Sequence, residues 1–224
     1  MEQESKPEQY RMVFLEYGMK RHFETNCFLK EKGTAATELW YIAKGTVRAF
    51  CTSVDGDDIT LFYVNEGSII YTESLVPNAV IVEDAQTISP VDVYVLSTER
   101  FLQIWEKHGM KIQDLFAHLI DRFVLLHEHI LCTHFRESNK RVAFLLYTCY
   151  RRSGAVISYT HEQIAAITGI NRVSVNRILN DFARDHLLSL GYRQIRILDI
   201  DRLSSVLRLI GYGALDEKSE HGEI

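Results

Sequence analysis

The sequence predicts an α+β chain with three successive parts: an N-terminal antiparallel β-barrel or jelly roll, a long helix, and a C-terminal winged helix-turn-helix. Three observations predict this order. Short β-type runs with glycine-centred turns occupy residues 21–95, an apolar repeat at helical spacing follows, and a helix–turn–helix pattern lies in residues 160–179. Of the 224 residues, 46% are apolar and 25% are charged, which is ordinary for a globular protein with a hydrophobic core.

Residues 1–109 are predicted to form the barrel domain. A short helix over 8–17 precedes β-type runs that are separated by turn residues. The runs are residue 23 and the segments 39–42, 46–50, 59–64, 68–71, 79–82 and 91–95. Short strands at regular spacing are typical of an antiparallel barrel or sandwich. Asp55-Gly56 predicts a hairpin turn, because glycine accepts positive φ without steric cost. Ser97 is the expected N-cap of a helix that closes this domain.

Residues 110–135 are predicted to form one long helix. Its apolar residues recur at alternating spacings of three and four, which is typical of helices that pair in a coiled coil. The seam consists of Phe116, Leu119, Phe123, Leu126 and Ile130, continued by Thr133. We interpret this seam as the interface of a two-fold homodimer. The alternative is a central helix buried in the core of one subunit.

Residues 136–212 contain the helix-turn-helix pattern. Ala165 is the small residue where two helices cross, and Gly169 provides the turn. Thr160, followed three residues later by Gln163, matches a capping box for the first helix, and Asn171 is the expected N-cap of the second. The apolar anchors of the two helices are Ile164, Ile167, Ile170, Val175, Ile178 and Leu179.

Charge is divided unevenly along the chain. The net charge is −5 overall, but residues 1–134 carry −8, residues 135–212 carry +6, and the tail 213–224 carries −3. Of the 12 basic residues in the middle block, 11 are arginine, which suits bidentate contacts with phosphate and guanine. This block indicates a phosphate-binding domain, although a solvated basic face would carry the same charge. The acidic tail is expected to be disordered.

The second helix of the motif carries the residues expected to read DNA. Five of its residues are predicted to face outward: Arg172, Val173, Ser174, Asn176 and Arg177. Arginine can bind the O6 and N7 atoms of guanine, asparagine can bind adenine, and valine can contact a thymine methyl group. Thr160 and Arg193, the latter near the tip of a β-wing, complete the expected DNA contacts. The alternatives are an ordinary solvated helix pair and a plain hairpin with solvent-facing arginines.

Several classes of site and location are disfavoured. The cysteines Cys27, Cys51, Cys132 and Cys149 lack the close spacing of zinc or iron–sulfur ligands, and we expect reduced thiols rather than a redox switch through Cys132. Only His22 falls in the β region, so a metal-dependent, cupin-like catalytic barrel has little support and no metal or cofactor is expected. Without an apolar run of about 18 residues or a secretory signal, we expect a cytoplasmic chain without a membrane partner.

The chain resembles the cyclic-AMP receptor protein/FNR family of bacterial transcription regulators. The resemblance is carried by the segments 30–33, 39–47, 55–56 and 65–67 in the barrel, and by 139–146 and 169–179 in the helical domain. It implies a cyclic-nucleotide-binding-like sensor domain, a homodimer on an inverted repeat in double-stranded DNA, and RNA polymerase as a partner. Many members place an acidic residue where Val173 stands, so the half-site is expected to differ.

The resemblance also implies an effector site between the barrel and the long helix. The corresponding residues here are Phe62, Tyr71, Thr72, Val82, Leu126 and His127. Cyclic-nucleotide binders carry a Gly-Glu pair and a later Arg-Ala pair, which residues 67–82 lack, and an N-terminal cysteine cluster is also absent. We therefore expect a small-molecule effector other than a cyclic nucleotide and no iron–sulfur cluster. A haem ligand, residues that simply fill the barrel core, and a constitutive regulator with a degenerate sensor are the open alternatives.

Overall fold

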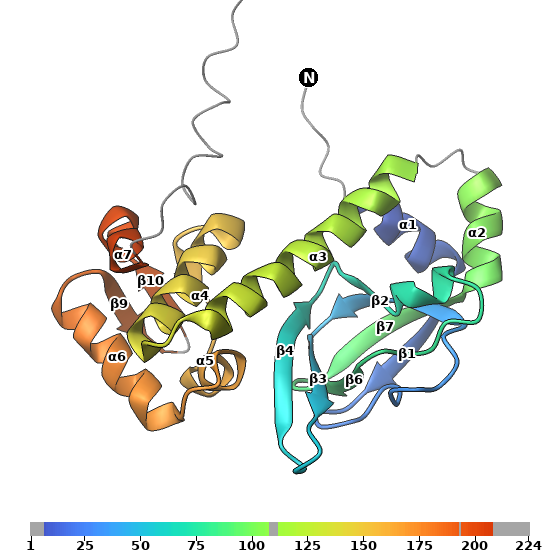
Figure 1. Ribbon diagram of the computed structural model, residues 1–224. Helices are drawn as coiled ribbons and strands as arrows, with labels where there is room; N and C mark the ends of the chain where they lie inside the picture. The colour runs from blue at the N-terminus through green and yellow to red at the C-terminus, as the bar shows by residue number, and fades with distance from the viewer. Residues whose placement is uncertain (1–6, 108–111, 193, 208–224) are drawn as a thin grey trace, which may run out of the picture. The chain divides into compact units, whose positions relative to one another are not determined.

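The computed structural model describes residues 7–107, 112–192 and 194–207 (Figure 1). The chain forms two compact units that divide inside the long helix α3, between His127 and Glu128. The elements of the first unit are α1 (Pro7–Tyr17), β1 (Met19–Phe23), β2 (Glu38–Lys44), β3 (Thr46–Thr52), β4 (Asp58–Asn65), β5 (Ile69–Ile70), the 3-10 helix η1 (Thr72–Leu75), β6 (Asp84–Thr87), β7 (Val91–Ser97), α2 (Thr98–Lys107) and the first part of α3 (Ile112–His134). Those of the second are α4 (Ser138–Ser153), β8 (Val156–Ile157), α5 (His161–Thr168), α6 (Arg172–Arg184), β9 (Leu188–Gly191), β10 (Gln194–Ile197) and α7 (Ile200–Leu207).

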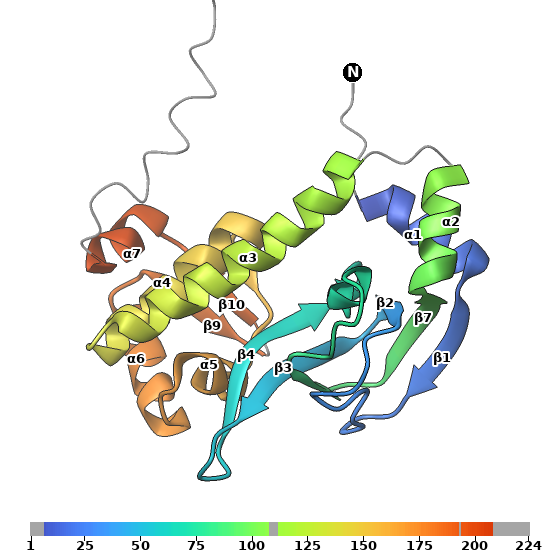
Figure 2. The ribbon, with the colours of Figure 1, turned by 45° about the vertical axis from the view of Figure 1, so that its right-hand side comes forward.

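Two antiparallel sheets form the barrel of the first unit, as the sequence predicts. Their strand orders are β1-β7-β2-β5 and β4-β3-β6. Apolar residues of both sheets fill the space between them, among them Trp40, Val47, Phe62, Ala85 and Val93. The long β3–β4 hairpin, which Figure 2 shows in full, reverses at Gly56 with φ +89°, which confirms the predicted turn.

One predicted strand lies elsewhere in the sequence. The β-branched run 79–82 forms only an isolated bridge, between Val80 and Ala35, and the ladder with β3 is made by β6 instead. The side chains of β6 alternate between half-buried and buried positions, so a polar sequence can pair with β3 while burying Ala85 and Thr87. β-propensity alone favoured the wrong segment, because it depends on side-chain type and not on which segment lies beside a partner strand in the fold.

Helices α1 and α2 cover the outer face of the larger sheet. Phe14 and Phe101 are fully buried against Leu39 and Tyr41, which alternate along β2 with residues of the barrel core. This explains the continuous apolar run in β2, since both of its faces are covered. The backbone N–H of Arg100 donates to the Ser97 hydroxyl at 3.2 Å, which confirms Ser97 as the cap of α2.

The second unit is a helical domain on a small sheet. Helices α4, α5, α6 and α7 enclose a core with the antiparallel sheet β8-β10-β9. The β9–β10 hairpin that the sequence predicts as a wing is present. Across the described ranges, no helix is long and apolar enough to cross a membrane.

The cysteines are free thiols, and those of the second unit are shielded. Burial raises the pKa of Cys132 to about 11 and that of Cys149 to about 12. Because the thiolate is the reactive form, these thiols are poor nucleophiles at neutral pH. The structure therefore gives no support to a redox switch through Cys132.

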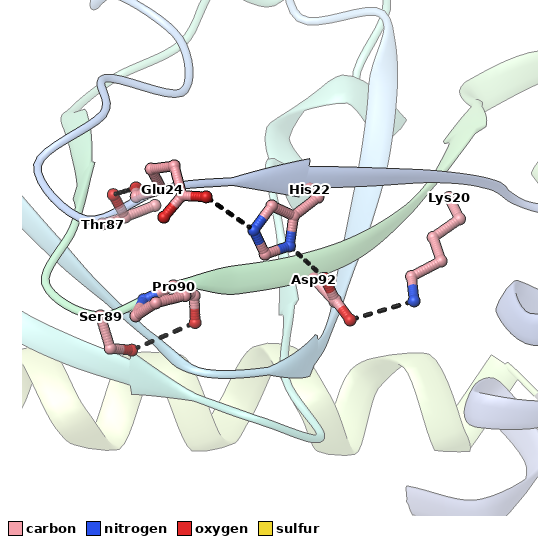
Figure 3. Close-up of polar contacts among 7 residues, drawn as sticks. All are labelled: Lys20, His22, Glu24, Thr87, Ser89, Pro90 and Asp92. Atoms are coloured by element: carbon pink, nitrogen blue, oxygen red, sulfur yellow. Dashed lines mark hydrogen bonds and ion pairs between the residues drawn. The ribbon is translucent and has the colours of Figure 1, made fainter.

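A charged cluster on paired strands of the barrel makes the stability of the first unit dependent on pH. His22 on β1 faces Asp92 on β7, with Nδ1 2.6 Å from the carboxylate, while Nε2 lies 3.5 Å from Glu24 (Figure 3). Lys20 holds the second oxygen of Asp92 at 3.0 Å. The hydrogen bond with Asp92 is the largest cause that raises the pKa of His22 above its usual 6.5.

We expect the His22 ring to titrate above pH 6.5 in the folded protein. A raised pKa means that the charged pair stabilises the fold fully below pH 6.5, and that this contribution is lost as pH rises through the folded-state pKa. In ¹H–¹⁵N spectra of the ring, Asp92→Asn should lower the pKa of His22. Asp84→Asn, on a strand of the other sheet, should not. A His22 pKa that Asp92→Asn does not move would contradict the assignment.

Candidate functional site

The turn between α5 and α6 is fixed by caps at both helix starts. The hydroxyl of Thr160 accepts from the Gln163 backbone N–H at 3.2 Å, and the Gln163 side chain accepts from the Thr160 N–H at 2.8 Å. Asn171 Oδ1 accepts from the Ser174 N–H at 2.8 Å. Gly169 ends α5 with φ +65°, a left-handed conformation that favours glycine. The predicted capping box, turn glycine and second cap are all confirmed.

Apolar anchors set which face of α6 is exposed. All six predicted anchors are buried: Ile164, Ile167, Ile170, Val175, Ile178 and Leu179. Ala165 packs against the same core. Because the anchors lie on one side of α6, the side chains between them must point into solvent.

The exposed face lies on the N-terminal half of α6. Arg172, Val173, Asn176 and Arg177 are exposed there, with Val173 at 80%, whereas Ser174 is half-buried. Arg172 lies 3.6 Å from the Glu162 carboxylate, and since both side chains are exposed this pair contributes little to stability. Arg177 makes no ion pair within 4 Å with any residue that the structure describes. This face presents two guanidinium groups, a methyl-bearing side chain and an amide.

The wing places further groups on the surface of the same unit. The pairing of Gly191 with Gln194 closes the β9–β10 hairpin. Tyr192 is 89% exposed and Arg196 is exposed on β10. The predicted contact residue Arg193 lies outside the described residues. The exposed aromatic ring of Tyr192 at this hairpin was not among the predicted DNA contacts.

The predicted effector residues have different environments. Phe62 and Tyr71 lie together in the barrel core, and Thr72 begins η1, half-buried. Val82 is 55% exposed, and the side chains of Leu126 and His127 on α3 are also exposed. The structure thus brings Phe62 and Tyr71 into one cluster, leaves Thr72 half-buried, and exposes Val82, Leu126 and His127.

A half-buried cation that was not among the predicted residues reaches the barrel from α3. The Arg122 guanidinium carbon lies 4.9 Å from the centre of the Phe62 ring, and Nη2 donates to the Ile69 carbonyl at 3.3 Å. Burial lowers the pKa of Arg122, which the carboxylates of Glu83 and Glu73 oppose; burial likewise raises the pKa of Glu83. A phosphate-binding arginine was considered only within residues 67–82. The available signal was Arg122 itself, the one arginine in the sequence of α3.

Tyr71 combines two unfavourable features. It has φ +63°, in the left-handed region that non-glycine residues seldom adopt. Its hydroxyl is buried without a hydrogen-bond partner among the described residues. Burial raises the pKa of Tyr71 far above its usual value. The nearby backbone N–H of Lys30 opposes this shift, but it does not reach hydrogen-bond geometry with the hydroxyl. The edge of the ring meets Trp40 at 5.3 Å, and the Lys30 ammonium lies over its face at 5.6 Å.

Replacing Tyr71 by phenylalanine should therefore not destabilise the ligand-free protein. Removing an unpaired buried hydroxyl while keeping the ring should raise the free energy of unfolding by about 1 kcal/mol. Urea unfolding of the wild type and of the Tyr71→Phe variant measures this change. Tyr41→Phe is the control, because the Tyr41 hydroxyl is not among the buried groups that lack a hydrogen-bond partner. A loss of more than about 1 kcal/mol would mean that the Tyr71 hydroxyl has a partner after all.

Family models match both units of the chain. The cyclic nucleotide-binding domain matches residues 20–108, and the Crp-like helix-turn-helix domain matches residues 140–206. The chain is 24% identical over 200 residues to the cyclic AMP receptor protein of Thermus thermophilus, covering 89% of this chain and 91% of that protein. It is 26% identical over 182 residues to the transcriptional regulator LdrP of the same organism, covering 77% and 88%.

Solved structures have the same fold. FixK2 from Bradyrhizobium japonicum aligns with a TM-score of 0.72 at 18% identity, covering 86% of this chain and 98% of that one. A CooA variant from Carboxydothermus hydrogenoformans aligns with a TM-score of 0.71 at 19% identity, covering 92% of each. The two family models match successive parts that together make up most of the chain. The chain therefore belongs to the CRP/FNR family of transcription regulators.

Proposed function

We propose that this regulator binds an inverted repeat in double-stranded DNA as a homodimer and responds to a small-molecule effector in its barrel. The observation that carries the DNA-binding part is the exposed face of α6, held outward by buried anchors. A helix with Arg172, Val173, Asn176 and Arg177 on its exposed N-terminal half fits the major groove. Ser174, Thr160 and Arg193 are proposed as further contacts. We propose no catalytic activity, because the family consists of transcription regulators.

The homodimer is supported by the surface of α3. Four residues of its predicted seam are exposed in the single chain: Phe116 at 58%, Phe123 at 65%, Leu126 at 39% and Ile130 at 55%. Leu119, which completes the seam, is half-buried. Pairing of two such helices would remove these side chains from water, which is the main driving force for coiled-coil formation. A two-fold dimer would then present its two α6 helices to half-sites about one DNA turn, ~34 Å, apart.

The effector is supported by polar groups buried in the barrel. The Tyr71 hydroxyl lacks a described partner, and Arg122 brings a half-buried guanidinium against Phe62. Buried polar groups without protein partners are frequently satisfied by a ligand. Glu73 and Glu83 offset the charge of Arg122, which disfavours an anionic cyclic nucleotide. Thr72, Val82, Leu126 and His127 are proposed for the rim of this site, and RNA polymerase is proposed as the partner of the DNA-bound dimer.

A constitutive regulator is the second candidate, and one observation favours it. The Tyr71 ring itself fills part of the barrel core, next to Trp40. A barrel that its own side chains fill would need no ligand to hold its shape. DNA affinity that no compound changes would favour this candidate over the effector-controlled one.

Selection of DNA from a random duplex library by the full chain tests the proposal. We expect enrichment of an inverted repeat whose half-sites are centred one helical turn apart. Affinity for that site should fall steeply with salt through counterion release. Enrichment of single half-sites only would contradict the dimer, and no enrichment at all would contradict sequence-specific binding. Addition of cyclic AMP should leave the affinity unchanged.

A further inference from the structure

One arginine in the second unit joins the exit of α3, the start of α4 and the end of α5. Arg141 lies in the first turn of α4. Its Nε donates to the carbonyl of Phe135, just after the end of α3, at 2.7 Å. Its Nη1 donates to the carbonyl of Thr168, the last residue of α5, at 3.2 Å. A single planar group thus bridges the exit of α3 and the turn of the helix-turn-helix.

The two carbonyls explain why an arginine stands there. The last four carbonyls of an α-helix have no partner within the helix, and Thr168 is fully buried, so its carbonyl must be satisfied by another group. A cation at this end also complements the helix dipole. The guanidinium presents several donors in a rigid plane, so it can bond two carbonyls at once, which a lysine ammonium on a flexible stem does less well.

Both ends of this bridge are held rigidly. The Phe135 ring packs 5.4 Å from that of Phe144, which is buried in the core. On the other side, the N–H groups of Gly169 and Ile170 both donate to the Ala165 carbonyl. A Cβ on Gly169 would lie 3.9 Å from Arg141 Nη1, so the guanidinium sits directly beside the turn.

We infer that Arg141 is a positioning residue for the recognition helix, because it transmits the placement of the end of α3 to the start of α6. Only Gly169 and Ile170 separate Thr168 from Asn171, the N-cap of α6. A displacement of Phe135 relative to α4 therefore reaches the N-terminal end of α6 through one side chain and a three-residue turn. In this inference Arg141 is not a phosphate contact, since its Nε and Nη1 donate to carbonyls inside the protein. This inference rests on the proposed function, in which the N-terminal half of α6 reads DNA.

The test compares specific with non-specific DNA binding. The full chain and its Arg141→Met, Arg141→Lys and Lys140→Met variants are titrated with the selected inverted repeat and with an unrelated duplex of equal length, at several salt concentrations. Lys140→Met is the matched control, because Lys140 lies in the same turn and contacts the carboxylate of Glu137. Circular dichroism confirms that each variant is folded at the assay temperature. Arg177→Ala is measured beside them.

We expect Arg141→Met to weaken binding to the inverted repeat by about 10- to 100-fold, the effect of losing two charge-assisted hydrogen bonds. Its affinity for the unrelated duplex should stay within about threefold, and its salt dependence should not change, because no phosphate contact is lost. Arg141→Lys should be intermediate, and Lys140→Met should show no selective loss. A merely structural role would reduce binding to both duplexes in proportion to the unfolded fraction.

That outcome would overturn the inference, and so would two further results. One is a folded Arg141→Met variant that prefers the inverted repeat over the unrelated duplex as strongly as the wild type does. The other is equal loss on both duplexes together with a salt slope that falls by about 0.9, which would identify a phosphate contact. The proposed function fails separately, if Arg177→Ala leaves discrimination unchanged.

Discussion

Replacing Arg177 by alanine is expected to cost about 1–3 kcal/mol of binding free energy for each half-site of the selected repeat, or about 5- to 150-fold. The guanidinium is exposed on the N-terminal half of α6 and is not tied to any carboxylate that the structure describes. A bidentate contact with one guanine is therefore available without breaking an internal ion pair. Specificity at the base pair that Arg177 reads should relax, while other positions of the site keep their preference.

The control for this substitution lies on the same helix. Arg184, in the last turn of α6, is 76% exposed and pairs with Asp181. Arg184→Ala removes an equal charge away from the predicted reading face, so it should change the affinity for all duplexes alike and leave the base preference intact. Gel-shift or fluorescence-anisotropy titrations with the selected site and its single-base variants measure both effects. Equal losses for the two variants, without a change in preference, would mean that Arg177 contacts only phosphate.

Replacing Phe123 by glutamate is expected to convert the dimer into a monomer. The substitution places a charge in the middle of the exposed seam of α3, where the partner helix would bury it without a counter-charge. Each monomer would then bind one half-site alone. Because a linked second site gains an effective concentration in the millimolar range, losing the link should reduce affinity for the full repeat by about 10²- to 10⁴-fold.

Light scattering and concentration-dependent melting measure this change. The melting temperature of the wild type should rise with protein concentration, as expected for a dimer, and that of Phe123→Glu should not. Leu102→Glu is the matched control, since Leu102 is an exposed apolar residue on α2, outside the seam. It should leave the dimer intact. A wild-type chain that is monomeric at assay concentrations would remove the basis for the inverted repeat.

The helix-turn-helix could be predicted in detail because its signals are local. The Thr160–Gln163 capping box, the Asn171 cap and the Gly169 turn each depend on residues within four positions of one another. The apolar anchors follow helical periodicity, so the exposed face of α6 follows from the sequence as well. The one residue there that differs is Ser174, which is half-buried in the first turn of α6 instead of facing outward.

The barrel site could be predicted only in part because its contacts are long-range. Arg122 meets Phe62 and Ile69 from a helix more than 50 residues away from either, and no local pattern records that approach. The left-handed conformation of Tyr71 is equally hidden, since a tyrosine carries no turn signal of its own. Strand β6 was missed for a related reason: its polar residues pair with β3 through the backbone, which residue preference does not register. The conformations and contacts of Arg122, Tyr71 and β6 therefore depend on tertiary structure.

Substitution of 7-deazaguanine into the selected site tests the central claim most directly. This base lacks the N7 acceptor that a bidentate arginine requires. At one guanine in each half-site, the substitution should weaken wild-type binding, and it should have no further effect on the Arg177→Ala variant, because the contact is already lost. Independent, additive losses from the base change and the Arg177 substitution at every guanine would show that α6 does not read the major groove through Arg177.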